Sequence, residues 1–255
     1  MARQPDGPPP PPTVQRLRLR YTKRGPLRFA SHRDLARALE RALRRAQVPM
    51  AFSAGFSPHP KISYMGAAPT GAASEAEYFE MGLAERRDPE QVRAALDASL
   101  PPGIDVLECV EALDGSGSLA DRLDATRWRI DLPGVDADEL AAAVRAFLAQ
   151  DTVLVAKRTK NGTKDVDARE AVVRAAVAVE AGCAILQVVV RQLTPTVRPD
   201  DVMAALAAVA DLRPPLPPRA VREAQGRLDD SGDVADPLGP DRAVRSCCQE
   251  ERAQV

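Results

Sequence analysis

The spacing of apolar residues switches repeatedly between the period of a strand and the period of a helix, and this order constrains the fold most. Residues 14–22 (VQRLRLRYT) alternate apolar and basic side chains, which is typical of a strand. We expect one face of this strand to be buried through Val14, Leu17, Leu19 and Tyr21. The arginines between them should project together from the other face.

A helix is predicted over residues 31–46, because Leu35, Leu39 and Leu43 recur every four residues and would share one buried face. Ser31 is a good N-cap residue, and the carboxylate of Asp34 suits the positive end of the helix. Five arginines lie mainly on the other faces, namely Arg33, Arg37, Arg41, Arg44 and Arg45.

The remaining elements give a β-α-β-β-α-β order that occurs twice. In the first half, residues 62–66, 76–83 and 104–112 read as strands and 88–99 as a helix. In the second half, strands are expected at 126–132, 152–158, 184–193 and 219–228, an apolar stretch at 171–179, and helices at 136–149 and 199–210. This order predicts an α+β fold of two tandem ferredoxin-like (split β-α-β) halves with disordered termini.

The expected domain boundaries follow from composition. The run Pro8–Pro12 is typical of an extended lead, and the Gly-Ser-Gly-Ser stretch at 115–118 is typical of a linker. We expect a disordered proline-rich lead at 1–13, one half at 14–112, a linker at 113–124, the other half at 125–228 and a disordered acidic tail at 229–255.

Composition also favours a cytoplasmic protein. No apolar run approaches the ~18 residues of a membrane helix, and the first residues do not read as a secretory signal. The four cysteines show neither a disulfide framework nor the spacing of a metal site, so we expect no metal and a reducing compartment. They are Cys109, Cys183, Cys247 and Cys248.

Charge is distributed unevenly along the chain. Residues 1–65 contain 13 lysines and arginines against 3 acidic residues, whereas residues 66–156 contain 7 against 18. A basic segment of this strength predicts a surface for a polyanion, which we expect to be RNA, with no DNA specificity. The alternative is that the basic and acidic segments neutralise each other within the fold.

The candidate phosphate contacts come from two basic sites. The second is the stretch 157–165, where Asn161–Gly162 predicts a hairpin turn with cations around the tip of a β-ribbon. The alternative for this hairpin is a solvated edge protected by lysines. The candidates are Arg16, Arg18, Arg20, Lys23, Arg24, Lys61, Lys157, Lys160 and Lys164.

His32 and His59 are the only two histidines, and both lie in the basic segment. An imidazole can donate a hydrogen bond to a phosphate or transfer a proton, so the two are candidate catalytic residues. Taken singly, each is better explained as a structural residue. The expected pocket between the helix start and the loop 53–61 comprises Ser31, His32, Asp34, Ser57, His59 and Glu77.

Three stretches of the chain resemble a known family. They are Tyr21-Thr-Lys-x-Gly25-x-Leu27-Arg28-Phe29-x-Ser31-His32-x-Asp34-Leu35, then Gly55-Phe-Ser-Pro-His59-Pro-Lys61-Ile-Ser63 with Ser74-Glu-x-Glu77-Tyr78, and then Lys157 to Asp167. Together they are similar to the radical-SAM-associated domain of unknown function, in its stand-alone form, over roughly residues 14–225.

The resemblance implies an accessory protein in RNA modification or processing. Its implied partners are RNA, a separate radical SAM enzyme or a ribonuclease of the E/G type. No C-x-x-x-C-x-x-C spacing occurs, so we expect no cofactor and no enzyme activity of the chain by itself. Two alternatives stay open: a metal-independent enzyme that acts on RNA through His32 or His59, and a protein-interaction module that docks a separate enzyme.

Overall fold

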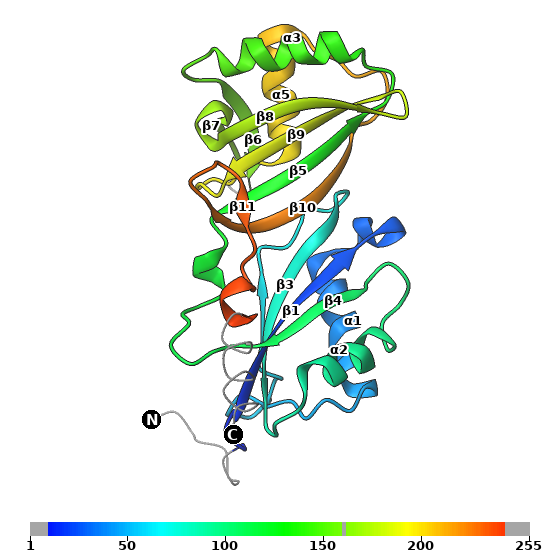
Figure 1. Ribbon diagram of the computed structural model, residues 1–255, viewed down its shortest axis with the longest axis vertical. Coiled ribbons are helices and arrows are strands. Elements are labelled where there is room, and N and C mark those ends of the chain that lie inside the picture. Colours follow the sequence, from blue (N-terminus) through cyan, green and yellow to red (C-terminus); the bar gives the residue numbers. More distant parts are fainter. Residues whose placement is uncertain (1–9, 160–161, 243–255) are drawn as a thin grey trace, which may run out of the picture. The chain divides into compact units, whose positions relative to one another are not determined.

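The computed structural model of the chain describes residues 10–159 and 162–242 (Figure 1). The chain divides into two compact units. Unit 1 comprises Met1–Asp121 and Pro237–Val255, and unit 2 comprises Arg122–Asp236. The first division falls within the stretch 113–124, where we expected a linker. Each unit combines helices with antiparallel strands, so the fold class is α+β.

Unit 1 contains the elements that the sequence predicts there, with a 3-10 helix (η1) in addition. They are β1 (Gln15–Lys23), η1 (Gly25–Phe29), α1 (His32–Arg45), β2 (Ile62–Met65), β3 (Ala73–Leu83), α2 (Pro89–Asp97) and β4 (Val106–Glu111). Within this unit the strands are ordered β4-β1-β3-β2, and each pairs antiparallel with its neighbour. A second 3-10 helix, η2 (Ala120–Arg122), lies at the boundary of the two units.

The core of unit 1 lies between one face of this sheet and helices α1 and α2. Leu17, Leu19 and Tyr21 of β1 are buried there, together with the α1 leucines that are spaced by four. Burying one such side chain contributes about 1.5–3 kcal/mol relative to leaving it in water, so this face positions α1 firmly on the sheet. Val14 was expected on the same face, but it precedes β1 and is 44% exposed.

The other face of β1 is closed around Arg18, which corrects the expectation that its arginines project together. The guanidinium is 1% exposed. It donates hydrogen bonds to Glu80 (2.8 Å), Asp241 (2.9 Å), Ser116 (3.0 Å) and the Gly117 carbonyl (2.5 Å). Burial would lower the pKa of Arg18, but the hydrogen bonds to Glu80 and Asp241 outweigh it and raise that pKa above its ordinary value.

The segment 229–242 is structured, although we expected disorder from residue 229. Strand β11 (Val234–Ala235) pairs with the end of β10 in unit 2. In unit 1, Asp241 is buried, binds Arg18 and accepts a hydrogen bond from the Leu113 N–H. Composition alone suggested a solvated tail. The buried Arg18 cation, however, needs negatively charged partners, and Asp241 in this segment is one of them. At the other end, Thr13 of the expected lead accepts a hydrogen bond from Lys61.

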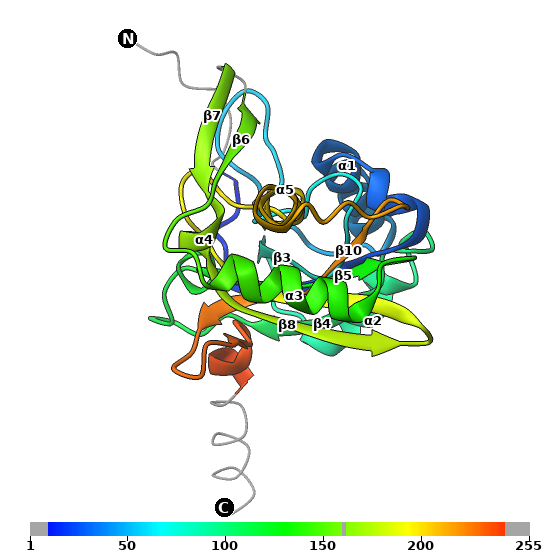
Figure 2. The same cartoon turned by 90° about the horizontal axis from the view of Figure 1, so that it is seen from above.

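Unit 2 repeats the strand order of unit 1, with a hairpin inserted. Its elements are β5 (Ala125–Leu132), α3 (Ala137–Leu148), β6 (Leu154–Thr159), β7 (Gly162–Asp167), α4 (Ala168–Ala171), β8 (Val172–Glu180), β9 (Cys183–Arg191), α5 (Pro199–Ala210), β10 (Arg219–Leu228) and β11. The strands are ordered β10-β5-β9-β8, all antiparallel. β6 and β7 form a separate two-stranded ribbon beside α4 (Figure 2).

We predict that Asp241→Asn lowers the free energy of unfolding by about 3 kcal/mol, because it leaves the buried Arg18 cation without one of its two carboxylate partners. Chemical denaturation followed by circular dichroism measures this. Asp230→Asn is the matched control, since Asp230 is exposed and the same change there should cost less than about 0.5 kcal/mol. Equal stability of Asp241→Asn and the wild type would contradict the prediction.

The start of α1 generates a second prediction. Ser31 donates a hydrogen bond to the Asp34 carboxylate (2.7 Å) and caps the helix by accepting from the Asp34 N–H (3.2 Å). The Ser31 hydroxyl, with Arg37 and Arg33 nearby, lowers the pKa of Asp34 below its ordinary value. The ionised Asp34 carboxylate therefore stabilises the folded protein at pH values above the ordinary pKa of an aspartate. This stabilisation is lost as the pH falls through the lowered pKa of Asp34. Ser31→Ala should raise the pKa of Asp34 in an NMR titration, and an unchanged pKa would contradict this.

Candidate nucleic-acid interface

Two of the candidate phosphate contacts lie inside unit 1. Arg18 is held by Glu80 and Asp241, as described above. Lys23 is 1% exposed, and its ammonium donates to the carbonyls of Ala68 and Pro69 at 3.2 Å each. Neither side chain offers a cation to a phosphate in this arrangement, because each lies under protein and is bonded to it.

Three further candidates on and after β1 are partly used by the fold. Arg24 forms ion pairs with Glu75 and Asp105, and the Glu75 hydrogen bond raises the pKa of Arg24. Arg20 donates to the Glu75 carbonyl at 2.8 Å. Arg16 is half-exposed and lies 3.9 Å from Glu80, so it is the most accessible of the three.

Of the basic residues in the hairpin of unit 2, one is bonded within the fold and others are exposed. Lys157 is 13% exposed, pairs with Asp201 and donates to the Thr196 carbonyl at 2.7 Å, so it anchors the ribbon at the start of α5. Lys164 and Arg158 are exposed and form no ion pair with the described residues. Lys160 and Asn161 lie outside the described residues.

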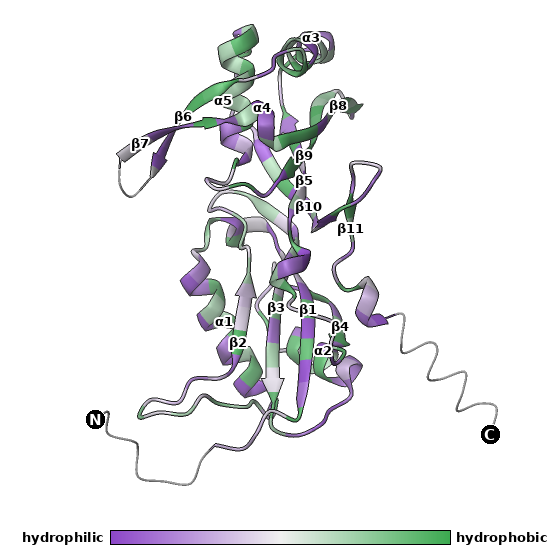
Figure 3. Ribbon diagram, turned by 90° about the vertical axis from the view of Figure 1, so that its left-hand side faces the viewer, coloured by the Kyte–Doolittle hydropathy of each residue, from purple (hydrophilic) through white to green (hydrophobic). Residues whose placement is uncertain are grey.

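Exposed cations of unit 1 also lie on α1. Arg33, Arg37 and Arg41, here called the arginine row, are exposed and follow one another at four-residue intervals along one side of the helix. Within the described ranges of the chain, none of the three forms an ion pair. Arg44 and Arg45 continue the exposed basic surface at the end of the helix. Figure 3 shows the hydrophilic residues along α1.

The sequence places this row by simple physical chemistry. Leu, Ala and Arg are strong helix formers, and the leucines bury one side of α1 while Ser31 caps its first turn. The arginines must then face water. From the sequence we expected these arginines on the faces of the helix that are not buried, but we did not include them among the candidate phosphate contacts. Their four-residue spacing, on a helix with five arginines against two acidic residues, was the signal that could have identified them.

The predicted pocket residues do not come together. Ser31, His32 and Asp34 lie at the start of α1, and the His32 ring meets the Tyr64 ring edge to face at 5.3 Å. Burial, with Glu40 nearby, raises the pKa of that tyrosine.

The remaining predicted pocket residues lie elsewhere. Ser57 and His59 lie in the exposed loop before β2. Glu77 is buried, and its carboxylate accepts from the Ala68 N–H. No described contact joins His32 to His59, because the helix start and this loop lie at opposite ends of α1.

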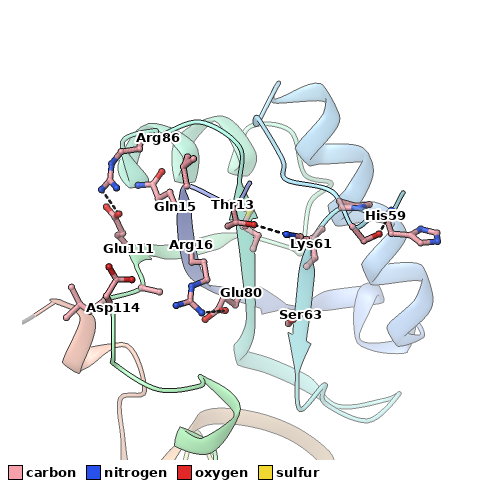
Figure 4. A pocket seen from close by; sticks show the side chains of 18 residues that line it. Thr13, Gln15, Arg16, His59, Lys61, Ser63, Glu80, Arg86, Glu111 and Asp114 are labelled. Carbon is pink, nitrogen blue, oxygen red and sulfur yellow. Dashed lines mark hydrogen bonds and ion pairs between the residues drawn. The ribbon is translucent and has the colours of Figure 1, made fainter. Parts of the chain in front are cut away.

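A groove of about 920 Å³ opens in unit 1 beside β1 and β2 (Figure 4). Its cations are Arg16, Lys61 and Arg86, and its anions are Glu80, Glu111 and Asp114. Figure 4 shows the His59 imidazole directed away from Lys61 and Thr13. With equal numbers of cations and anions, the groove has no net attraction for a polyanion, so it is a weaker candidate than α1.

Other kinds of site find little support in the part of the chain that the structure describes. There, no group of three or more His, Cys, Asp or Glu side chains could hold a metal ion. Cys109 is buried and Cys183 is partly buried, while Cys247 and Cys248 lie outside the described residues. No described helix is long and apolar enough to cross a membrane.

Comparison with solved structures gives a distant likeness. The first two RRM domains of the yeast poly(U)-binding protein Pub1 align over 82% of this chain and 98% of that chain, at 14% identity and a TM-score of 0.20. A TM-score this low supports no argument about fold or function.

Comparison with protein families is informative. No curated protein matches the chain. The model of a family described as an uncharacterized protein conserved in bacteria (DUF2344) matches residues 16–199, which includes all of β1 to β9 except the first residue of β1. Since this match covers well over half of the 255 residues, the chain belongs to the DUF2344 family of uncharacterized bacterial proteins.

Proposed function

We propose that this protein binds RNA through the exposed arginine row of α1. The observation that carries the proposal is the contrast between Arg33, Arg37 and Arg41, which form no ion pair with the described residues, and cations such as Arg18 and Arg24, which form two each. The fold thus neutralises many of its basic side chains and leaves this row facing solvent.

Arginine suits this task because its guanidinium is always charged and presents donors that match the oxygens of a phosphate. Cations fixed along one side of a helix displace counterions from a nucleic acid backbone, which supplies sequence-independent affinity. Charge alone fits any polyanion. RNA is chosen because the resemblance to the radical-SAM-associated domain implies an RNA modification or processing context.

The topology is consistent with this proposal. We infer that both units are ferredoxin-like, because each has the β-α-β-β-α-β order, with the β6–β7 hairpin and α4 inserted in unit 2. In both units the last strand of this order lies beside the first and the second lies at the far edge, giving β4-β1-β3-β2 and β10-β5-β9-β8. In this arrangement one face of α1 packs against the sheet of unit 1, and its other face is exposed to solvent.

A separate radical SAM enzyme and an E/G-type ribonuclease stay as predicted partners, and they rest on the resemblance alone. Catalysis by His32 and His59 together is not part of the proposal, since the structure does not join the two side chains. The exposed cations of the hairpin, Lys164 and Arg158, form a second, smaller candidate contact.

We predict that the triple variant Arg33→Gln, Arg37→Gln, Arg41→Gln binds RNA more weakly and with less dependence on salt. Losing three phosphate contacts should reduce the slope of log Kd against log salt by about 2, since each contact to a single strand contributes about 0.7. Glutamine keeps a high helix propensity, so α1 should stay folded. Fluorescence anisotropy of a labelled RNA over a salt series measures the slope.

The matched control removes three exposed arginines that already have carboxylate partners, namely Arg87, Arg213 and Arg242. Changing these to glutamine alters the net charge of the protein equally but should leave the salt slope within error of the wild type. If both triple variants behave alike, the arginine row is not the binding surface. If neither variant nor the wild type retains RNA, the protein does not bind RNA.

A further inference from the structure

Three phenylalanine side chains face solvent, which is unusual for a residue that normally fills a core. Phe29, Phe52 and Phe56 are 59%, 41% and 71% exposed, whereas Phe79 and Phe147 are at most 1% exposed. The chain has five phenylalanines, so three of the five lie on the surface. All three exposed rings come from the basic segment that contains α1.

The two most exposed rings, Phe29 and Phe56, come from the segments that precede and follow α1 in the chain. Phe29 ends η1, three residues before α1 begins, and the Arg28 guanidinium lies 4.7 Å from its ring centre. After α1 the Val48 N–H donates to the Leu43 carbonyl, and Phe56 follows in the loop between α1 and β2. α1 has 14 residues and is therefore about 21 Å long.

The loop of Phe56 is built to hold an exposed ring. Phe56 follows Gly55, whose φ of +135° favours glycine, and it precedes Pro58 and Pro60. The loop is closed by a hydrogen bond from the Ser53 N–H to the His59 carbonyl (2.8 Å). Two prolines and this closure restrict the chain, which lowers the entropy lost when the ring meets a ligand.

We propose that the ligand of the arginine row is single-stranded RNA, with phosphates on the row and unpaired bases stacked on Phe29 and Phe56. This inference rests on the proposed function and narrows it to one class of RNA. Every base has a π-face that an aromatic ring can stack on, whereas the bases of a duplex already stack on one another. The rings therefore add affinity for a single strand and none for a duplex.

An anionic membrane surface is the competing ligand, because a basic amphipathic helix with exposed rings also suits lipid headgroups. Such a helix inserts its apolar face among the lipids. In α1 that face is already taken, since Leu35, Leu39 and Leu43 are at most 2% exposed and form part of the unit 1 core. Two isolated rings, in the segments before and after a charged helix, fit separated bases better than a continuous lipid phase.

The test compares a labelled oligouridine with a blunt RNA duplex of the same length by fluorescence anisotropy. Phe29→Ala and Phe56→Ala should each weaken binding of the single strand by at least about fivefold, with duplex binding unchanged. Phe29→Tyr and Phe56→Tyr keep a ring and should keep the affinity. Leu216→Ala is the control for loss of an exposed apolar side chain, since Leu216 is 53% exposed and lies in unit 2.

The outcomes separate this inference from the proposed function. If the alanine variants bind the oligouridine like the wild type while the arginine triple variant does not, single-strand stacking is overturned and RNA binding by α1 stands. If duplex and oligouridine lose affinity equally in the alanine variants, stacking on unpaired bases is also overturned. If vesicles of phosphatidylcholine and phosphatidylglycerol displace the oligouridine, and bind only when both rings are present, the ligand is a membrane surface.

Discussion

The buried guanidinium of Arg18 is the interaction on which much of unit 1 depends. From the middle of β1 it binds Glu80 on β3, the glycine–serine stretch after β4 and Asp241 near the end of the described chain. A cation in this position is stable only when its partners surround it, because an unpaired buried charge costs several kcal/mol. The segment around Asp241 is therefore part of the domain, and the outer face of β1 is closed by the chain's own residues.

This closure divides the basic residues of the N-terminal third into two classes. Arg18, Lys23 and Arg24 hold strands and loops in place through carboxylates and carbonyls. Arg33, Arg37 and Arg41 of α1 form no such bonds with the described residues, because the helix presents them to solvent, away from its buried leucines. A net positive charge over a stretch of sequence thus combines structural cations with available ones, and only the available ones attract a polyanion. The exposed rings of Phe29 and Phe56 are the second kind of contact that we propose.

Local patterns predicted the elements well because each has a local cause. The leucines of α1 sit on one face at a spacing of four, and Ser31 and Asp88 start their helices by capping free N–H groups. The Asn-Gly dipeptide indicated the ribbon of β6 and β7, whose strands pair as an antiparallel hairpin. The four-residue helix α4 and the two-residue strand β11 were missed, since elements this short have too few residues to show a period.

From the sequence alone came the order of strands and helices, the buried face of α1 and the concentration of positive charge in the first 65 residues, since periodicity, capping and charge are properties of neighbouring residues. Tertiary structure decided which charges remain available. Arg18 and Asp241 are 223 positions apart, and no local pattern can pair them. The same holds for the histidines: both lie in the basic segment, yet the length of α1 separates the helix start from the loop of His59, because distance in a folded chain is set by topology and packing.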